Sequence, residues 1–110
     1  MKRLILKRNE EKALRTLKKE LSKRFKVAGM RLFGSKVRGE DTPESDIDVM
    51  IELNESNPDV ELQIYDLLFE INLQNDTFIS TTIFNKKEIE EGPMSESPIY
   101  KVILKEGVPI

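Results

Sequence analysis

The sequence predicts an α/β fold in which a small mixed β-sheet packs against helices. The first observation is that segments with helical and strand-like spacing of apolar residues follow one another in the order helix, strand, strand, helix, strand, helix. The second is the composition of the 110 residues, of which 38% are hydrophobic and 35% are charged, as is typical of a globular protein with a highly charged surface. This length suits a single domain, residues 1–110.

The first half of the chain is predicted to contain one long helix and two strands. Leu14, Leu17 and Leu21 recur at the three- and four-residue spacing of one helix face. Residues 46–51 show the two-residue alternation of a strand. The predicted elements are a helix at 9–26, a strand at 27–33, a helical turn at 36–38, a polar loop at 39–45 and a strand at 46–51.

The second half is predicted to contain a further long helix and a third strand. Asn57 has a side chain typical of a helix N-cap, and Pro58 suits the first helical position. The predicted elements are a helix that begins at 58, a strand at 76–84, a short helix at 86–91, a helix at 97–106 and an edge strand at 107–110. We expect the core to contain all the phenylalanines, namely Phe25, Phe33, Phe69, Phe78 and Phe84.

The chain contains no cysteine and no histidine. This absence excludes disulfides, zinc sites built from these residues, cysteine nucleophiles and histidine general bases. Any reaction that this chain catalyses must therefore depend on carboxylates, hydroxyls, lysines, arginines or a metal ion bound by oxygen. No apolar run approaches the roughly 20 residues that span a bilayer, and the N-terminus becomes charged too soon for a signal peptide. We expect a cytoplasmic protein without membrane contact.

The charges are segregated along the chain. Residues 1–38 carry fourteen Lys and Arg against three Glu, whereas residues 39–110 carry four Lys against seventeen Asp and Glu. Such segregation favours a basic face for a phosphate, a nucleic acid or an acidic partner, or else a helix simply coated with Lys and Arg. No aromatic residues are interleaved with the basic ones, so nucleic-acid binding is the least favoured of these functions.

A phosphate-binding turn is predicted where the first strand ends. Gly34 allows a phosphate to approach the backbone, and the N–H groups at the start of the helical turn attract anions. Ser35 adds a hydroxyl donor, and Lys36 and Arg38 add positive charge. Alternatively, Gly34 and Ser35 form only a turn, and Arg38 braces Glu44 and the loop that follows.

A carboxylate pair is predicted on the second strand. Asp46 and Asp48 are two residues apart, so their side chains leave the same face of the strand. Two adjacent carboxylates repel each other unless a cation lies between them, and Mg²⁺ suits such oxygen ligands. The alternative is a solvated strand face. The turn and the pair together, separated by ten residues, predict phosphoryl-transfer chemistry.

At these residues the sequence resembles a known family. The segment Leu32-Phe33-Gly34-Ser35-Lys36-Val37-Arg38-Gly39, followed by Ser45-Asp46-Ile47-Asp48-Val49, resembles the signature of the DNA polymerase β nucleotidyltransferase superfamily. The spacing is most similar to its minimal nucleotidyltransferase branch, small proteins that are often antitoxins of helical HEPN toxins. The resemblance implies the polymerase β-like fold.

The resemblance also implies a mechanism and a partner. Gly34 and Ser35 would hold the triphosphate of ATP, Asp46 and Asp48 would bind two Mg²⁺ ions, and AMP would pass to a tyrosine of a HEPN toxin. Such a chain would act as an antitoxin in a hetero-oligomer. A second hypothesis is that the protein has weak or no catalytic activity and neutralises its partner by occlusion.

The resemblance also implies a third carboxylate, and the sequence leaves open which residue occupies its position. Asp76 is the only acid in the predicted third strand, where it would be both catalytic and a metal ligand. A different register would place Ser80 at this position and leave the metal site incomplete. As a further alternative, Asp76 simply ends the preceding helix.

Overall fold

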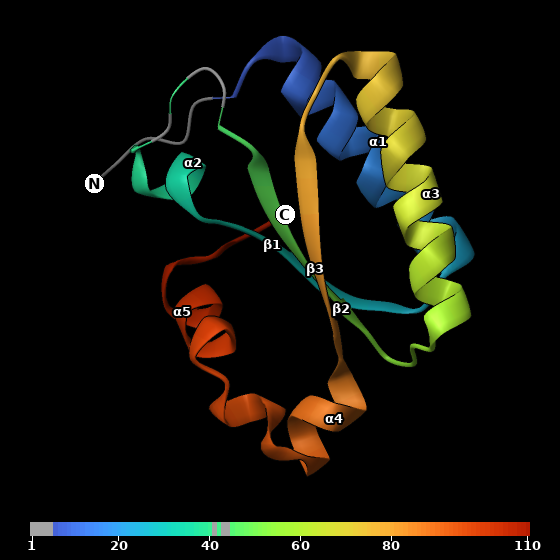
Figure 1. The fold of residues 1–110 in the computed structure, drawn as a ribbon, viewed down its shortest axis with the longest axis vertical. Helices are drawn as coiled ribbons and strands as arrows, with labels where there is room; N and C mark the ends of the chain where they lie inside the picture. Colours follow the sequence, from blue (N-terminus) through green and yellow to red (C-terminus); the bar gives the residue numbers. More distant parts are fainter. Residues whose placement is uncertain (1–5, 41, 43–44) are drawn as a thin grey trace.

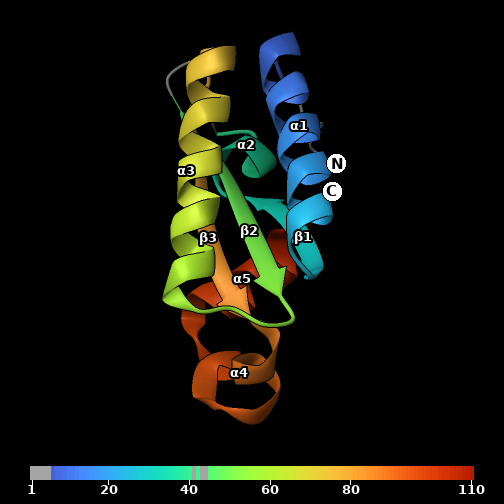
Figure 2. The ribbon, with the colours of Figure 1, turned by 90° about the vertical axis from the view of Figure 1, so that its right-hand side faces the viewer.

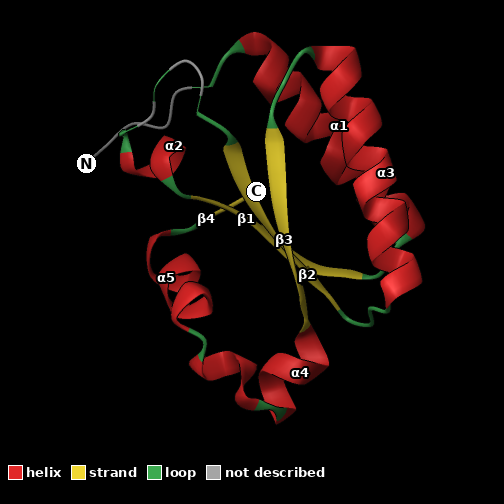
Figure 3. Ribbon diagram, in the orientation of Figure 1, coloured by secondary structure: helices red, strands yellow, loops and turns green. Residues whose placement is uncertain are grey.

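The computed structural model describes residues 6–40, 42 and 45–110 and confirms the mixed α/β fold (Figures 1 and 3). The elements in chain order are α1 (Arg8–Arg24), β1 (Val27–Phe33), α2 (Ser35–Arg38), β2 (Ile47–Leu53), α3 (Pro58–Asn75), β3 (Ile79–Asn85), α4 (Lys86–Glu91), the 3₁₀ helix η1 (Pro93–Glu96), α5 (Pro98–Glu106) and β4 (Val108–Pro109). Within these described residues, no helix is both long and apolar enough to cross a membrane.

The sheet has the strand order β3-β2-β1-β4. β1 pairs with β2 and with β4 in the antiparallel direction, whereas β2 and β3 are parallel. A parallel pair needs a crossover connection, and α3 supplies it. The predicted mixed sheet is therefore confirmed, including the short edge strand at the C-terminus.

One face of the sheet is covered by α1 and α3, which lie side by side (Figure 2). The apolar faces of both helices pack on strand residues such as Val49 and Ile51. Helix residues buried in this core include Leu14, Leu17, Leu21, Ile64, Leu68 and Ile71. The helical spacing found in the sequence therefore marks the sides of α1 and α3 that face the sheet.

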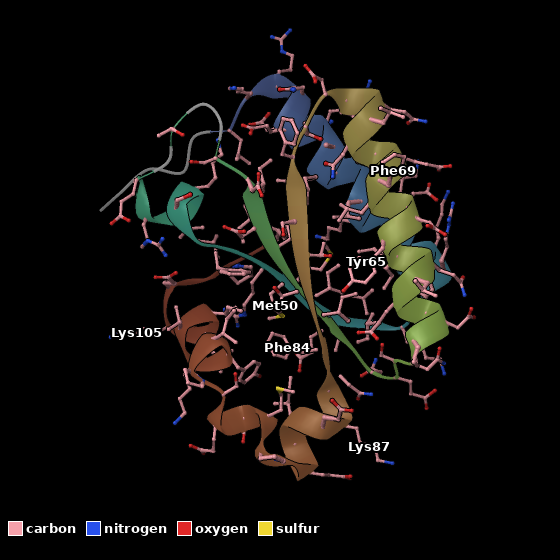
Figure 4. All side chains as sticks on the ribbon, in the orientation of Figure 1. Met50, Tyr65, Phe69, Phe84, Lys87 and Lys105 are labelled. Carbon is pink, nitrogen blue, oxygen red and sulfur yellow. The ribbon has the colours of Figure 1, made fainter. Side chains whose placement is uncertain are left out.

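The opposite face is covered in part by the C-terminal helices. Met50 and Phe84 lie at the centre of this second core (Figure 4), against Tyr100 and Ile103 of α5. The rings of Phe84 and Tyr100 meet edge to face with centroids 5.2 Å apart. Asp48 precedes Met50 by two residues and thus lies on the same face of β2, yet its side chain is only partly buried. The second core therefore ends just short of the predicted carboxylate pair.

The ends of α3 show one confirmed prediction and one error. The side chain of Asn57 accepts a hydrogen bond from the Val60 N–H at 2.9 Å, and Pro58 is the first helical residue, as predicted. The predicted start of the third strand at Asp76 was wrong. Asp76 is the C-cap of α3, with a left-handed φ of 53°, and β3 begins only at Ile79. A helix can end in this conformation at Asp, because the short polar side chain tolerates it.

Two of the five phenylalanines are not in the core. Phe69 on α3 and Phe78 just before β3 are exposed over 68% and 67% of their surface. The prediction of a core position was wrong for both because residue type alone does not show which side of an element meets the sheet.

Candidate active site

The predicted phosphate-binding turn lies where β1 ends. Gly34 has φ 84° and ψ −158°, a conformation that is essentially restricted to glycine, and α2 begins at the next residue. The Gly34 carbonyl oxygen accepts hydrogen bonds from the Val37 and Arg38 N–H groups, each at 3.1 Å, which closes the helical turn. The preceding residue, Phe33, is paired with Asp48 on β2. The turn and the carboxylate are therefore neighbours across two strands.

The backbone at Gly34 lies directly against the carboxylate of Asp48. A Cβ atom added at Gly34 would collide with Oδ2 of Asp48. Glycine is thus required here both by the backbone conformation and by the lack of space.

We expect Gly34→Ala to lower the free energy of unfolding by about 1–3 kcal/mol from backbone strain alone. It should also displace Asp48 and reduce activity, because the methyl group and the carboxylate cannot occupy the same space. Gly29→Ala on β1 is the matched control: its Cβ would lie 3.7 Å from Glu52 Oε2, an ordinary contact. Urea unfolding of both variants measures the difference, and equal stability of the two would contradict the prediction.

The two carboxylates meet at the start of β2. Asp46 is exposed and lies one residue before the strand, whereas Asp48 lies within it and is partly buried. The Ile47 N–H between them donates to the Phe78 carbonyl oxygen at 2.8 Å, which holds this end of β2 beside the segment that leads into β3. Ser45, the residue before Asp46, accepts a hydrogen bond at its hydroxyl from the Thr42 N–H at 2.8 Å.

The electrostatics of the pair favour a bound cation. Burial, and next the nearby charge of Asp46, raise the pKa of Asp48 above its ordinary value, and Arg38 opposes this shift. Two negative charges held together in this way are stabilised by a positive ion between them. Among the described residues, no group of three or more acidic side chains is placed to hold a metal ion together.

The raised pKa of Asp48 has a consequence for the metal-free protein. Above that pKa, an ionised Asp48 costs more free energy in the folded chain than in the unfolded chain. We therefore expect Asp48→Asn to be more stable than the wild type at neutral pH in the presence of a chelator. The difference should vanish near about pH 3, where the carboxyl is protonated in both states. Urea unfolding at both pH values measures it, and a wild type that is the more stable at neutral pH would contradict it.

The position beside Asp48 on the third strand is occupied by Ser80. The parallel register pairs Asp48 with Ser80. Asp76 does not join Asp46 and Asp48, because it ends α3, and its carbonyl oxygen accepts a hydrogen bond from the Asn9 side chain at 3.2 Å. Of the alternatives that the sequence left open, the structure supports the register with Ser80 and the helix-ending position of Asp76.

Lys36 and Arg38 both form ion pairs with protein carboxylates. Lys36 was predicted to present its charge to a phosphate, but its Nζ lies 3.3 Å from Oε2 of Glu10 on α1 and its side chain is only 3% exposed. Arg38 donates from Nε to Glu40 Oε2 and from Nη1 to Glu106 Oε1, each at 3.0 Å. Arg38 therefore braces its surroundings, but through Glu40 and Glu106; Glu44, the partner expected from the sequence, lies outside the described residues. The positive charge at the turn thus comes mainly from backbone N–H groups and from the partly exposed Arg38.

Sequence reasoning missed three residues that support the site. Glu10 holds Lys36, and Glu106 connects α5 to α2 through Arg38. Asn72 shapes the α3–β3 connection, since its side chain accepts from Ile79 N at 2.9 Å and donates to the Ile79 carbonyl oxygen at 3.1 Å. The position of Glu10 in the first turn of a predicted helix was a signal for a capping role. Glu106 and Asn72 act through contacts for which the sequence carries no local pattern.

Comparisons with known proteins agree with this geometry. The sequence matches the nucleotidyltransferase domain family over residues 14–109. Two proteins of Methanocaldococcus jannaschii, each named "Putative protein adenylyltransferase", are 44% identical over 85 residues and 41% identical over 76 residues. The first match covers 71% of this chain and 85% of the relative. The second covers 69% of this chain and 84% of the relative.

A solved structure shows the same fold. A crystal structure of a "putative nucleotidyltransferase" from Sulfolobus solfataricus superimposes with a TM-score of 0.53 at 19% identity, and the match covers 96% of this chain and 87% of the other. The fold fits the polymerase β-like type, with the glycine turn and the carboxylates at adjacent strand ends. The chain belongs to the nucleotidyltransferase family and is a nucleotidyltransferase enzyme.

Proposed function

We propose that this protein transfers the adenylyl group of ATP to a hydroxyl group of a protein acceptor, with Mg²⁺ bound by Asp46 and Asp48. The observation that carries the proposal is the contact between the Gly34 backbone and the Asp48 carboxylate. This contact supports the proposal because phosphate bound at the turn would lie directly beside a cation bound by Asp48, as phosphoryl transfer requires. The names of the relatives as protein adenylyltransferases support the protein acceptor.

The donor set suits Mg²⁺. Two carboxylates supply hard oxygen ligands, and Mg²⁺ is commonly held by one or two carboxylates together with substrate phosphates and water. We propose two such ions, which when bound neutralise the charge that develops on the phosphate oxygens. The ordinary repulsion between Asp46 and Asp48 would then become a source of affinity for cations.

The residues of the chain position the reactants. The N–H groups at the start of α2 hold the phosphates that become pyrophosphate, and Gly34 lets them approach closely. The hydroxyl oxygen of the acceptor attacks the α-phosphorus of ATP and forms a new P–O bond. The bond from that phosphorus to the bridging oxygen breaks, pyrophosphate leaves, and the hydroxyl proton passes to solvent.

We propose a tyrosine of a helical HEPN-type toxin as the acceptor, so that the protein is an antitoxin that works in the cytoplasm as part of a hetero-complex. The acceptor class is supported by the names of the relatives, and the toxin by the similarity of the motif to minimal nucleotidyltransferases.

The intact mass of a purified HEPN-type toxin, after incubation with this protein, ATP and Mg²⁺, tests the proposal. We expect the toxin to gain the mass of one or more AMP groups, and tandem mass spectrometry to locate them on tyrosine. The same reaction with GTP, CTP and UTP measures the choice of base. An unmodified toxin, under conditions in which the two proteins form a complex, would overturn the proposal.

The presence of Ser80 beside Asp48 favours one alternative, a binding protein that neutralises its partner by occlusion. In that case a variant that lacks both Asp46 and Asp48 would still bind and inhibit the toxin. Loss of inhibition in this double variant, with binding retained, would instead support the enzyme.

A further inference from the structure

The outer side of α3 carries a second set of apolar residues. The inner side is buried against the sheet, but Leu62, Tyr65, Phe69 and Leu73 are exposed, with exposed fractions of 62%, 46%, 68% and 72%. Their spacing of three and four residues places them on one face of the helix, over about 16 Å of its length. Tyr65 and Phe69 lie along α3 in Figure 4. We call these four residues and Phe78 the α3 outer stripe.

One end of the stripe lies near the start of β2. Phe78, which is 67% exposed, lines a hollow of about 390 Å³ together with Phe69 and Leu73. The Phe78 carbonyl oxygen accepts the hydrogen bond from Ile47 N, one residue beyond Asp46. Phe78 therefore places one end of the stripe near the end of β2 that carries Asp46 and Asp48, although α3 and Asp48 lie on opposite faces of the sheet.

The charged residues of α3 itself are all negative. Asp59, Asp66 and Glu70 are exposed, and each precedes an apolar stripe residue by three positions, which makes them neighbours on the helix surface. The chain has no Lys or Arg between residues 39 and 85. Charge complementarity thus points to an occupant with basic residues beside its apolar ones.

A second copy of this chain fits the stripe poorly. Pairing α3 with another α3 would set acidic residues against each other, at a cost in free energy. The exposed residues of α1 are all polar or charged. α5 does present Ile99, Val102 and Lys105, but α3 and α5 cover opposite faces of the sheet, so contacts between them would propagate into a filament instead of closing a dimer (Figure 1).

We propose that the α3 outer stripe is a docking surface for an α-helix of another protein. That helix presents apolar residues at matching spacing, with Lys or Arg beside them, and packs along α3. Docking would bring the partner protein to the active site as the acceptor of the nucleotide. This link rests on the proposed function. The docking itself is measured without nucleotide.

Calorimetric titration with synthetic helical peptides tests the proposal. The first peptide has Leu at i, i+4, i+7 and i+11 and Lys between them; the second has Glu in place of Lys, and the third has Ser in place of Leu. We expect only the first to bind the wild-type protein. Phe69→Ser combined with Leu73→Ser should weaken this binding at least about tenfold, whereas Val102→Ser on α5, the matched control, should leave it unchanged.

A second variant retains the apolar residues and reverses the flanking charge. Asp66→Lys with Glu70→Lys should weaken binding of the Lys peptide and permit binding of the Glu peptide. Equal binding of all three peptides, or binding that the Phe69 and Leu73 changes do not weaken, would overturn the proposal. The proposal would also be overturned if the wild-type protein sedimented as a dimer and the Phe69 and Leu73 changes converted it to a monomer. If the Lys peptide binds but no acceptor protein is adenylylated, the proposed docking surface stands and only the proposed function is contradicted.

Discussion

Asp46→Asn and Asp48→Asn are each expected to lower the rate of nucleotidyl transfer by at least about 10²–10³-fold, the loss seen when one electrostatic contact to the transition state is removed. Each change removes the negative charge of a carboxylate that we propose as a metal ligand, while the side chain keeps its size. The fold should survive, because Asp46 is exposed and Asp48 is only partly buried. Release of pyrophosphate measures the rate, and titration with Mg²⁺ measures the loss of metal affinity.

Asp76→Asn is the matched control for these two variants. Asp76 ends α3 with a left-handed φ, which Asn also adopts readily. Since the structure does not bring Asp76 to the carboxylate pair, we expect this variant to keep a rate close to that of the wild type. A loss as large as that of Asp48→Asn would show that Asp76 is the third catalytic carboxylate, and would contradict the two-carboxylate site.

Lys36→Met is expected to lower the free energy of unfolding by about 3–5 kcal/mol. The ion pair between Lys36 and Glu10 is almost fully enclosed, with exposed fractions of 3% and 9% for the two side chains, so that removal of the lysine leaves a buried carboxylate without its cation. Oε1 of Glu10 also accepts the Lys7 N–H at 2.8 Å and cannot turn away without a further loss. Urea unfolding at neutral pH measures the effect.

Removal of both charges should cost much less than removal of one. We expect Glu10→Leu combined with Lys36→Met to recover most of the stability, because neither charge of this pair is then left buried without the other. Lys86→Met, which breaks the exposed pair with Glu90, is the control and should change stability little. A Lys36→Met variant as stable as the wild type would show that the pair does not hold α2 against α1.

Local patterns predicted most elements because each depends on neighbouring residues. The apolar spacing of α1 and α3 and the alternation in β2 survive in the structure, and so does the cap at Asn57. The start of β3 was predicted too early because Asp76, Thr77 and Phe78 have strand-like neighbours, but the Asn72 side chain holds this segment in a turn. No local pattern records a side chain that reaches seven residues along the chain.

The sequence by itself determined the fold class and the nucleotidyltransferase family, and it singled out Gly34, Asp46 and Asp48 as candidate site residues, because short-range spacing specifies a turn and a carboxylate pair. Tertiary structure alone decided that Lys36 is paired with Glu10, that Arg38 joins Glu106, and that Ser80 lies beside Asp48. These contacts join residues 26 to 68 positions apart, and strand register and helix packing select them. The tertiary structure is also needed to show that α3 carries apolar residues on a side that the sheet does not cover.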